Sequence, residues 1–96
     1  MDDNVFRAMA DTTRREIINL LKWKNMNAGE IAGHFKISKP SISRHLDVLE
    51  NAKLITSERR GNQILYSLNV SIVQEVLMEF IGIFSTLKES SNDKKD

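Results

Sequence analysis

The feature that most constrains the fold is a change of hydrophobic period near residue 52. Residues 39–52 place apolar side chains three or four positions apart, which is the pattern of a helix with one buried face. Residues 54–58 and 63–68 instead show the alternation typical of strands, and the run Arg59-Arg60-Gly61-Asn62 between them carries a Gly-Asn turn signal. The sequence therefore predicts a helix followed directly by a β-hairpin with a basic tip.

Cap residues define the helices that precede the hairpin. Asp11, Asn27 and Ser38 are each placed to accept hydrogen bonds from the first amides of a helix, and Glu30 stands at the capping-box position after Asn27. Pro40 fits the first turn of a helix, where its missing amide has no partner to lose. We therefore expect an amphipathic helix at 4–9 and longer helices at 12–23, 28–35 and 39–52, the last two joined by a tight turn.

The order of these elements predicts a fold class. The predicted order is helix, helix, helix, tight turn, helix, hairpin and helix. This order indicates a mainly α (α+β) winged helix-turn-helix, with about five helices and a two-stranded β-hairpin wing. A chain of 96 residues has room for one domain. We place that domain at residues 1–88 and expect residues 89–96 to form a flexible polar tail.

The final helix, expected from about residue 71 to 88, has more apolar surface than one small domain can cover. Its apolar stripe continues to Leu87. The helix is either a core element of one chain or one half of a twofold interface, and the size of the patch favours the interface. The predicted interface comprises Val5, Phe6, Met9, Val73, Val76, Leu77, Phe80, Ile81 and Phe84.

Positive charge is concentrated around the predicted turn and hairpin, although the net charge of the chain is only +1. Residues 36–66 hold six cations and three acids, whereas residues 67–87 hold two acids and no cation. One part of the molecule is thus suited to a polyanion and another to protein. A helix of ordinary width fits the major groove of B-DNA, and its amino end suits phosphate.

The predicted DNA contacts come from the outer face of helix 39–52 and from the hairpin. Steps of about 100° per residue from an inward Leu46 place Ser41 and Arg44 outside, with Ser43 and His45 at the boundary. Arg44 is suited to a guanine edge, to which a guanidinium can donate two hydrogen bonds. The predicted DNA-binding residues are Lys39, Ser41, Ser43, Arg44, His45, Arg59, Arg60 and Gln63.

Three of the basic positions have a second interpretation. His45 is either a packed, hydrogen-bonded residue or a DNA donor, since a histidine accommodates both roles. Arg14 and Arg15 either face solvent or bridge helices, or they contact phosphate.

Several functional classes are excluded or disfavoured. Ser43, His45 and Asp47 have the residue types of a catalytic triad, but positions two apart on a helix point about 200° away from each other, so we expect no enzyme. The chain has no cysteine, and Glu30 and His34 lack further ligands beside them, so we expect no metal or other cofactor. The acidic start and the absence of a long apolar run predict a cytoplasmic protein without a membrane span.

Three stretches of the chain resemble the ArsR/SmtB family of bacterial repressors, and in particular its metal-free autorepressor branch. They are FRAMADTTRREIINLL, MNAGEIAGHFKISKPSISRHLDVLENAKLI and ERRGNQILYSLN. Thr12 departs from the family, which often has proline there. The resemblance implies a homodimer joined through its first and last helices, a palindromic operator in double-stranded DNA, and no metal. A metal- or ligand-responsive sensor of the same fold and a winged-helix protein–protein adaptor stay open as alternatives. No partner that would relieve repression can be predicted.

Overall fold

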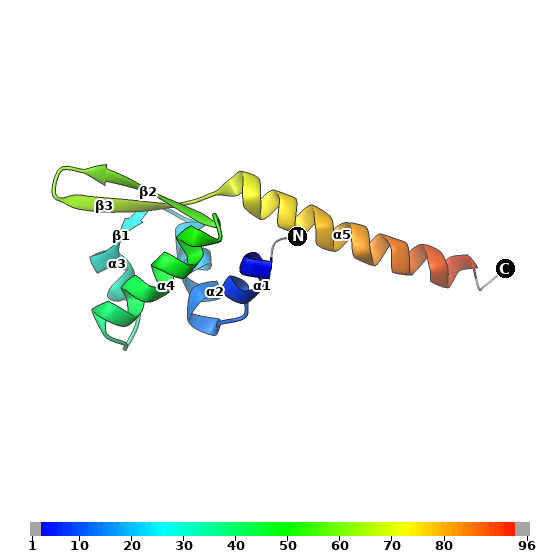
Figure 1. The fold of residues 1–96 in the computed structure, drawn as a ribbon, viewed down its shortest axis with the longest axis horizontal. Helices are drawn as coiled ribbons and strands as arrows, with labels where there is room; N and C mark the ends of the chain where they lie inside the picture. The colour runs from blue at the N-terminus through cyan, green and yellow to red at the C-terminus, as the bar shows by residue number, and fades with distance from the viewer. Residues whose placement is uncertain (1–2, 94–96) are drawn as a thin grey trace.

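The computed structural model describes residues 3–93, with side chains described up to residue 85, and its helices and hairpin strands follow the predicted order, with one additional short strand (Figure 1). Five helices and a three-stranded antiparallel sheet form a winged helix-turn-helix in this part of the chain. The elements are α1 (Asp3–Met9), α2 (Thr12–Leu21), β1 (Met26–Asn27), α3 (Ala28–Ala32), α4 (Lys39–Asn51), β2 (Ile55–Arg60), β3 (Gln63–Leu68) and α5 (Val70–Asp93).

The three predicted N-caps are confirmed. The Asp11 carboxylate accepts from the backbone amide of Arg14 at 3.0 Å, and the Ser38 hydroxyl accepts from the amide of Ser41 at 3.3 Å. Asn27 and Glu30 form a reciprocal capping box, because each side chain accepts from the backbone amide of the other, at 2.8 and 3.0 Å. These caps satisfy amides that a helix start leaves without intrahelical partners.

The structure differs from the sequence-based prediction in the extent of some elements and in one strand; for example, the helix expected over 12–23 ends at Leu21. The helix expected over 28–35 ends at Ala32, because the amides of His34 and Phe35 turn back to carbonyls three residues earlier, in the tighter 3₁₀ pattern. The strand β1 was not predicted, and it turns the two-stranded hairpin into a sheet of order β1-β3-β2, with Met26 opposite Tyr66.

The wing is built from β2 and β3 in continuous register, from Ile55 opposite Leu68 to Arg60 opposite Gln63. Arg59 and Arg60 were expected in the turn, but they are the last two residues of β2. The turn is only Gly61-Asn62, and Gly61 has a φ of 62°. A two-residue hairpin needs such a left-handed conformation, which glycine adopts without steric cost.

The core lies between α1–α4 and the base of the sheet. On α4, Ile42, Leu46 and Leu49 are buried, as the helical period predicted. The helix ends in a Schellman motif, in which the amide of Lys53 bonds to Glu50 and the amide of Leu54 bonds to the Leu49 carbonyl. Lys53 takes the left-handed conformation with a φ of 64°, and this reversal directs the chain into β2.

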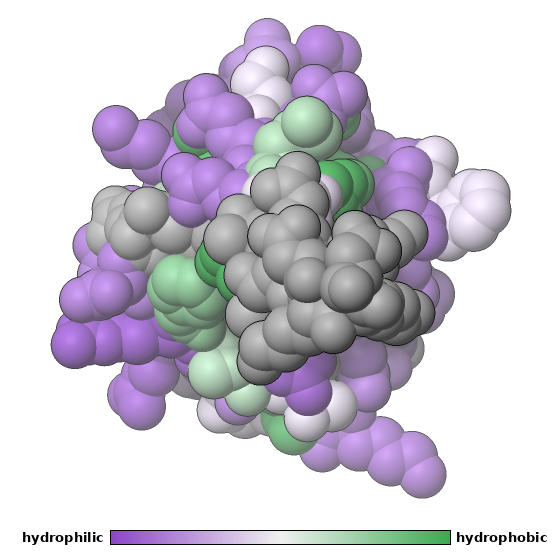
Figure 2. Space-filling model, turned by 90° about the vertical axis from the view of Figure 1, so that its right-hand side faces the viewer, coloured by the Kyte–Doolittle hydropathy of each residue, from purple (hydrophilic) through white to green (hydrophobic). Residues whose placement is uncertain are grey.

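Helix α5 leaves the body beside α1 and extends well beyond it (Figure 1). Its first turns pack on the core through Ile72, Val73 and Val76. Farther along, the ring of Phe80 meets Phe6 of α1 edge-on, with centroids 5.8 Å apart. The remaining apolar side chains of its described part are exposed: Val70, Leu77, Met78, Ile81, Ile83 and Phe84. Viewed from the α5 end, apolar surface gathers close around this helix, inside a mostly hydrophilic periphery (Figure 2).

The structure locates all nine residues of the predicted interface. Val5 is only 5% exposed, so it belongs to the core of its own chain, and Met9 is half-buried. Phe6, Leu77, Phe80, Ile81 and Phe84 are exposed, while Val73 and Val76 are partly covered. The side chain of Leu87 and residues 94–96 of the predicted tail lie outside the described part, and α5 itself continues past residue 88 to Asp93.

Candidate nucleic-acid interface

The outer face of α4 presents the polar residues that the sequence placed there. Lys39, Ser41, Ser43 and Arg44 are exposed, while the opposite side of the helix is buried in the core. The first turn carries no acid. Its free amides and the positive end of the helix dipole add to the charge of the side chains, so this end attracts anions.

The amino end of α4 is fixed by two serines. Ser38 accepts from the amide of Ser41 and donates its own hydroxyl proton to the Ser41 oxygen, at 2.9 Å. Pro40 occupies the first turn, where a proline ring is compatible with helix geometry. The presentation of Ser43 and Arg44 one turn later therefore rests on a well-defined helix start.

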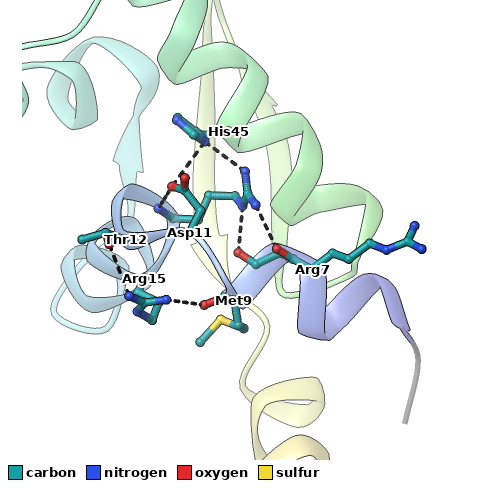
Figure 3. Close-up of polar contacts among 8 residues, drawn as sticks. Arg7, Met9, Asp11, Thr12, Arg15 and His45 are labelled. Carbon is teal, nitrogen blue, oxygen red and sulfur yellow. Dashed lines mark hydrogen bonds and ion pairs between the residues drawn. The ribbon is translucent and has the colours of Figure 1, made fainter.

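His45 faces inward, toward the corner between α1 and α2. Its side chain is 19% exposed, and its Nδ1 lies 3.3 Å from Nη1 of Arg14 and 3.8 Å from a carboxylate oxygen of Asp11. Figure 3 shows one ring nitrogen of His45 turned toward Asp11 and the other directed away from it. The packed, hydrogen-bonded interpretation of His45 is thus confirmed for the Nδ1 side of the ring.

The Asp11 carboxyl next to this histidine has a pKa below its ordinary value of 3.8. The main cause is the hydrogen bond from the backbone amide of Arg14, which favours the charged form. The charges of His45 and Arg14 act in the same direction, while partial desolvation opposes them. The carboxylate is therefore ionised at neutral pH.

The wing carries its basic residues at its outer end. Arg59 and Arg60 are exposed at the outer end of β2, and Arg60 Nη2 lies 3.3 Å from the carboxylate of Glu58. Gln63 accepts a hydrogen bond from the Asn27 side-chain amide at 3.3 Å, so it braces the wing against the start of α3. An open groove runs between the wing, α3 and α4, lined in part by Gly29, Ser43 and Ile64.

Comparison with known proteins decides the family. The family model described as "Bacterial regulatory protein, arsR family" matches residues 11–57. The transcriptional repressor SdpR of Bacillus subtilis (strain 168) is 53% identical over 73 residues, which cover 76% of this chain and 81% of SdpR. The chain belongs to the ArsR family of bacterial regulatory proteins. It is a DNA-binding transcriptional regulator and not an enzyme.

Other ArsR-family members agree with this assignment. The arsenical resistance operon repressor of Staphylococcus aureus is 30% identical over 82 residues, covering 85% of this chain and 78% of that protein. Among solved structures, an ArsR-like transcriptional regulator from Rhodococcus sp. RHA1 matches with a TM-score of 0.80 at 25% identity. The match covers 91% of this chain and 82% of the Rhodococcus chain, so the similarity includes α5 as well as the body.

The ArsR fold gives Arg14 and Arg15 structural roles that the sequence left open. Arg14 donates to the carbonyls of Ala8 and Arg7 at 2.7 and 2.8 Å, and Arg15 donates to the carbonyl of Met9 at 2.8 Å. Both arginines therefore bond to carbonyls at the carboxyl end of α1, of which that of Arg7 also accepts from the backbone amide of Ala10 at 3.2 Å. The helix-bridging interpretation is confirmed, and the contact between Arg14 and His45 is a feature that the sequence did not reveal.

The described residues show neither a cluster of metal-ligating side chains nor a membrane-spanning helix. No three His, Cys, Asp or Glu side chains converge there in a way that would hold a metal ion. None of the helices in the same part of the chain is both long and apolar enough to cross a membrane.

Proposed function

We propose that this ArsR-family chain is a cytoplasmic, homodimeric transcriptional repressor that binds a palindromic operator and requires no metal. The observation that carries the proposal is the two-sided character of α4. Its inner side is anchored by three buried aliphatic residues, and its outer side offers Lys39, Ser43 and Arg44 beside a basic wing. Anchoring on one side holds the polar groups of the other in fixed positions, as readout of base edges requires.

The expected docking places α4 in the major groove and the wing along the flanking backbone. Arg44 donates to base edges, and Lys39, Arg59 and Arg60 bond to phosphates. The two hydroxyls of Ser41 and Ser43 and the ring of His45 add contacts at the groove edge, and Gln63 supports the wing. Occupancy of the operator then excludes polymerase from the promoter.

The homodimer is supported by the apolar surface of α5. Leu77, Phe80, Ile81 and Phe84 are exposed in one chain, next to Phe6 of α1. A second copy related by a twofold axis would cover this surface with the same residues. Two copies of α4 would then enter successive major grooves on one face of the duplex, roughly 34–36 Å apart, which matches a palindrome.

Metal independence is supported by the composition of the chain. It contains no cysteine and only two histidines, His34 and His45. His45 is already engaged with Arg14 and Asp11. Addition of divalent ions or of a chelator is expected to leave the dissociation constant for the operator unchanged, and a large shift would favour a metal-responsive regulator instead.

The decisive experiment is selection of binding sites from a random DNA pool, followed by titration of the selected duplex at several salt concentrations. We expect a twofold-symmetric site and an affinity that falls steeply with salt, because phosphate contacts release counterions. A protein–protein adaptor would select no sequence and would show no salt-dependent binding. Sedimentation of the same preparation would show whether the species that binds is a dimer.

Arg44→Ala tests the assignment of the reading residue. It is expected to cost roughly 1–3 kcal/mol of operator binding and to reduce the preference for operator over random DNA. Lys53→Gln, which removes one charge at the other end of the same helix, serves as the control and should change both quantities little. Arg60→Ala should weaken operator and random DNA alike. If Arg44→Ala binds both DNAs as the parent does, α4 is not the reading element.

A further inference from the structure

Arg14 connects three helices through one guanidinium group. Its Nε donates to the carbonyl of Ala8 at 2.7 Å and its Nη2 donates to the carbonyl of Arg7 at 2.8 Å, both at the end of α1. Its Nη1 lies 3.3 Å from Nδ1 of His45 on α4, while its own backbone lies in the first turn of α2. The rigid, planar fork of arginine fixes the relative directions of these contacts, which a flexible ammonium would not do.

The contact with Arg14 favours one tautomer of the neutral His45 ring. A guanidinium can only donate, so in the neutral ring Nδ1 accepts and the proton resides on Nε2. That nitrogen is directed away from the cluster (Figure 3). His45 directly follows Arg44 and lies one turn after Ser41, so the link ends among the residues proposed to contact DNA.

The other end of the link reaches the surface proposed to join two chains. Ala8 and Val5 bury α1 in the core, and Phe6 on the same short helix packs edge-on against Phe80 of α5. A displacement of α1 along α5 is therefore passed to Arg14 through the two carbonyls that it binds. From there it reaches α4 at His45, close to the amino end that would enter the groove.

We propose that Arg14 is a positioning residue that sets the direction of α4 relative to the α1–α5 face, and thereby the spacing between operator half-sites that the dimer accepts. The inference rests on the proposed function, since it requires a dimer on a two-part operator. In such a dimer each α4 is placed by its own α1–α5 face, so a loosened link lets the two recognition helices vary in separation. Adding one base pair moves a half-site by about 3.4 Å along the duplex and turns it by about 35° around the axis, so a firm link makes a mis-spaced operator costly and a loosened link lowers that cost.

The test compares Arg14→Lys with Arg15→Lys on operators whose half-site spacing is varied by one base pair in each direction. Both substitutions keep the charge, so non-specific attraction to DNA is the same. Arg15 is a matched control because it also bonds to the end of α1, at the carbonyl of Met9, while its other hydrogen bond goes to Thr12 within α2. The link from α1 to α4 is therefore weakened in Arg14→Lys and kept in Arg15→Lys.

We expect the parent and Arg15→Lys to share a clear preference for one spacing. In Arg14→Lys this preference should fall by roughly fivefold to tenfold, the scale of one lost hydrogen bond or somewhat more. An unchanged profile in Arg14→Lys overturns the inference. Equal flattening in both variants also overturns it, because anchoring of α1 alone would then explain the effect.

A second variant and a second measurement cover a failure of Arg14→Lys to fold. His45→Ala removes the α4 end of the link while leaving both carbonyl contacts of Arg14, and it should flatten the spacing profile as well. In the free protein, ¹⁵N chemical shifts of the His45 ring should report an Nε2–H tautomer in the parent and in Arg15→Lys. An Nδ1–H tautomer in the parent would contradict the link without any DNA. If the parent binds no duplex, the proposed function has failed, and the spacing inference falls with it.

Discussion

The body of the molecule and helix α5 use apolar residues in opposite ways. Among the described residues, the large side chains that are fully buried all lie in the body, from α1 to β3: Ile17, Ile31, Ile42, Leu46, Leu49, Leu54 and Ile55. In the described part of α5 no side chain is buried, and Phe84 and Met78 are 65% and 64% exposed. The body therefore has a core of its own, whereas the described part of α5 carries apolar surface that the body leaves exposed.

The two regions also differ in what defines their shape. Helices of the body begin at capped positions and are cross-linked by Arg14, Arg15 and the capping box of Asn27 with Glu30. Beyond Phe80, the large apolar side chains of the described part of α5, which are Ile81, Ile83 and Phe84, are exposed and do not belong to the core. Stability of the body should thus be independent of protein concentration, whereas burial of the α5 surface should depend on it.

The largest expected effect is in the body. Leu46→Ala removes a side chain with 0% exposure from the centre of α4, and it should lower the free energy of unfolding by about 2–5 kcal/mol. Chemical denaturation measures this loss, with Leu77→Ala on exposed α5 as the comparison in dilute, monomeric protein. Equal losses at the two sites would show that the body has no independent core.

The next effect is on α5 and concerns association. Phe84→Ala should weaken the dimer by about 2 kcal/mol or more, because aromatic side chains often dominate an interface. Met78→Ala is the control, since Met78 has the same exposure in one chain but lies roughly 120° around the helix from Phe84. Sedimentation equilibrium measures the dimer dissociation constant of both variants. If α5 associated non-specifically through every side, Phe84→Ala and Met78→Ala would lose the same amount of dimerisation free energy.

A smaller effect, back in the body, depends on pH. Asp11→Ala removes the cap of α2 and should cost about 1 kcal/mol of stability at neutral pH. Because the pKa of Asp11 is lowered on folding, its ionised form stabilises the fold above its ordinary value of 3.8, and this contribution is lost as the pH falls through the lower folded value. The unfolding free energies of parent and variant should therefore converge in acid.

Asp11→Asn provides the matched control for that titration. Asparagine caps a helix about as well as aspartate does, but it has no charge to lose. At neutral pH this variant should be about as stable as the parent. In acid its free energy of unfolding should not show the loss that protonation of Asp11 causes in the parent. A penalty for Asp11→Ala that is the same at neutral and acidic pH would contradict the role of the charge.

Local features of this fold were predictable, and long-range ones were not. Caps at Asp11, Asn27 and Ser38 depend on residues within one turn, so the sequence was sufficient to place them. The strand β1 consists of two residues that are defined by pairing with β3, and no local pattern marks it. The early end of α3 likewise follows from tight turns leading into α4.

The candidate site shows the same division. Exposure of Arg44 and burial of Leu46 follow from helical period alone, and both were predicted. Arg59 and Arg60 were placed in a loop because a two-residue turn cannot be told from a four-residue one by composition. The link from Arg14 to His45 spans 31 positions in sequence and depends on how α1, α2 and α4 meet, which the pattern of residues does not encode.

Asn69, which follows β3, joins the start of α5 to the residues just after α4 through its hydrogen bonds. Its side-chain amide donates to the carbonyl of Lys53 at 2.9 Å, its backbone amide donates to Leu54 at 2.9 Å, and its side-chain oxygen accepts from Ile72 at the start of α5. A helix of 24 residues is about 36 Å long, so a tilt of about 10° at this residue would displace the far end by about 6 Å. A small change in the hydrogen bonds of Asn69 would therefore produce a larger displacement at the carboxyl end of α5 than at its start.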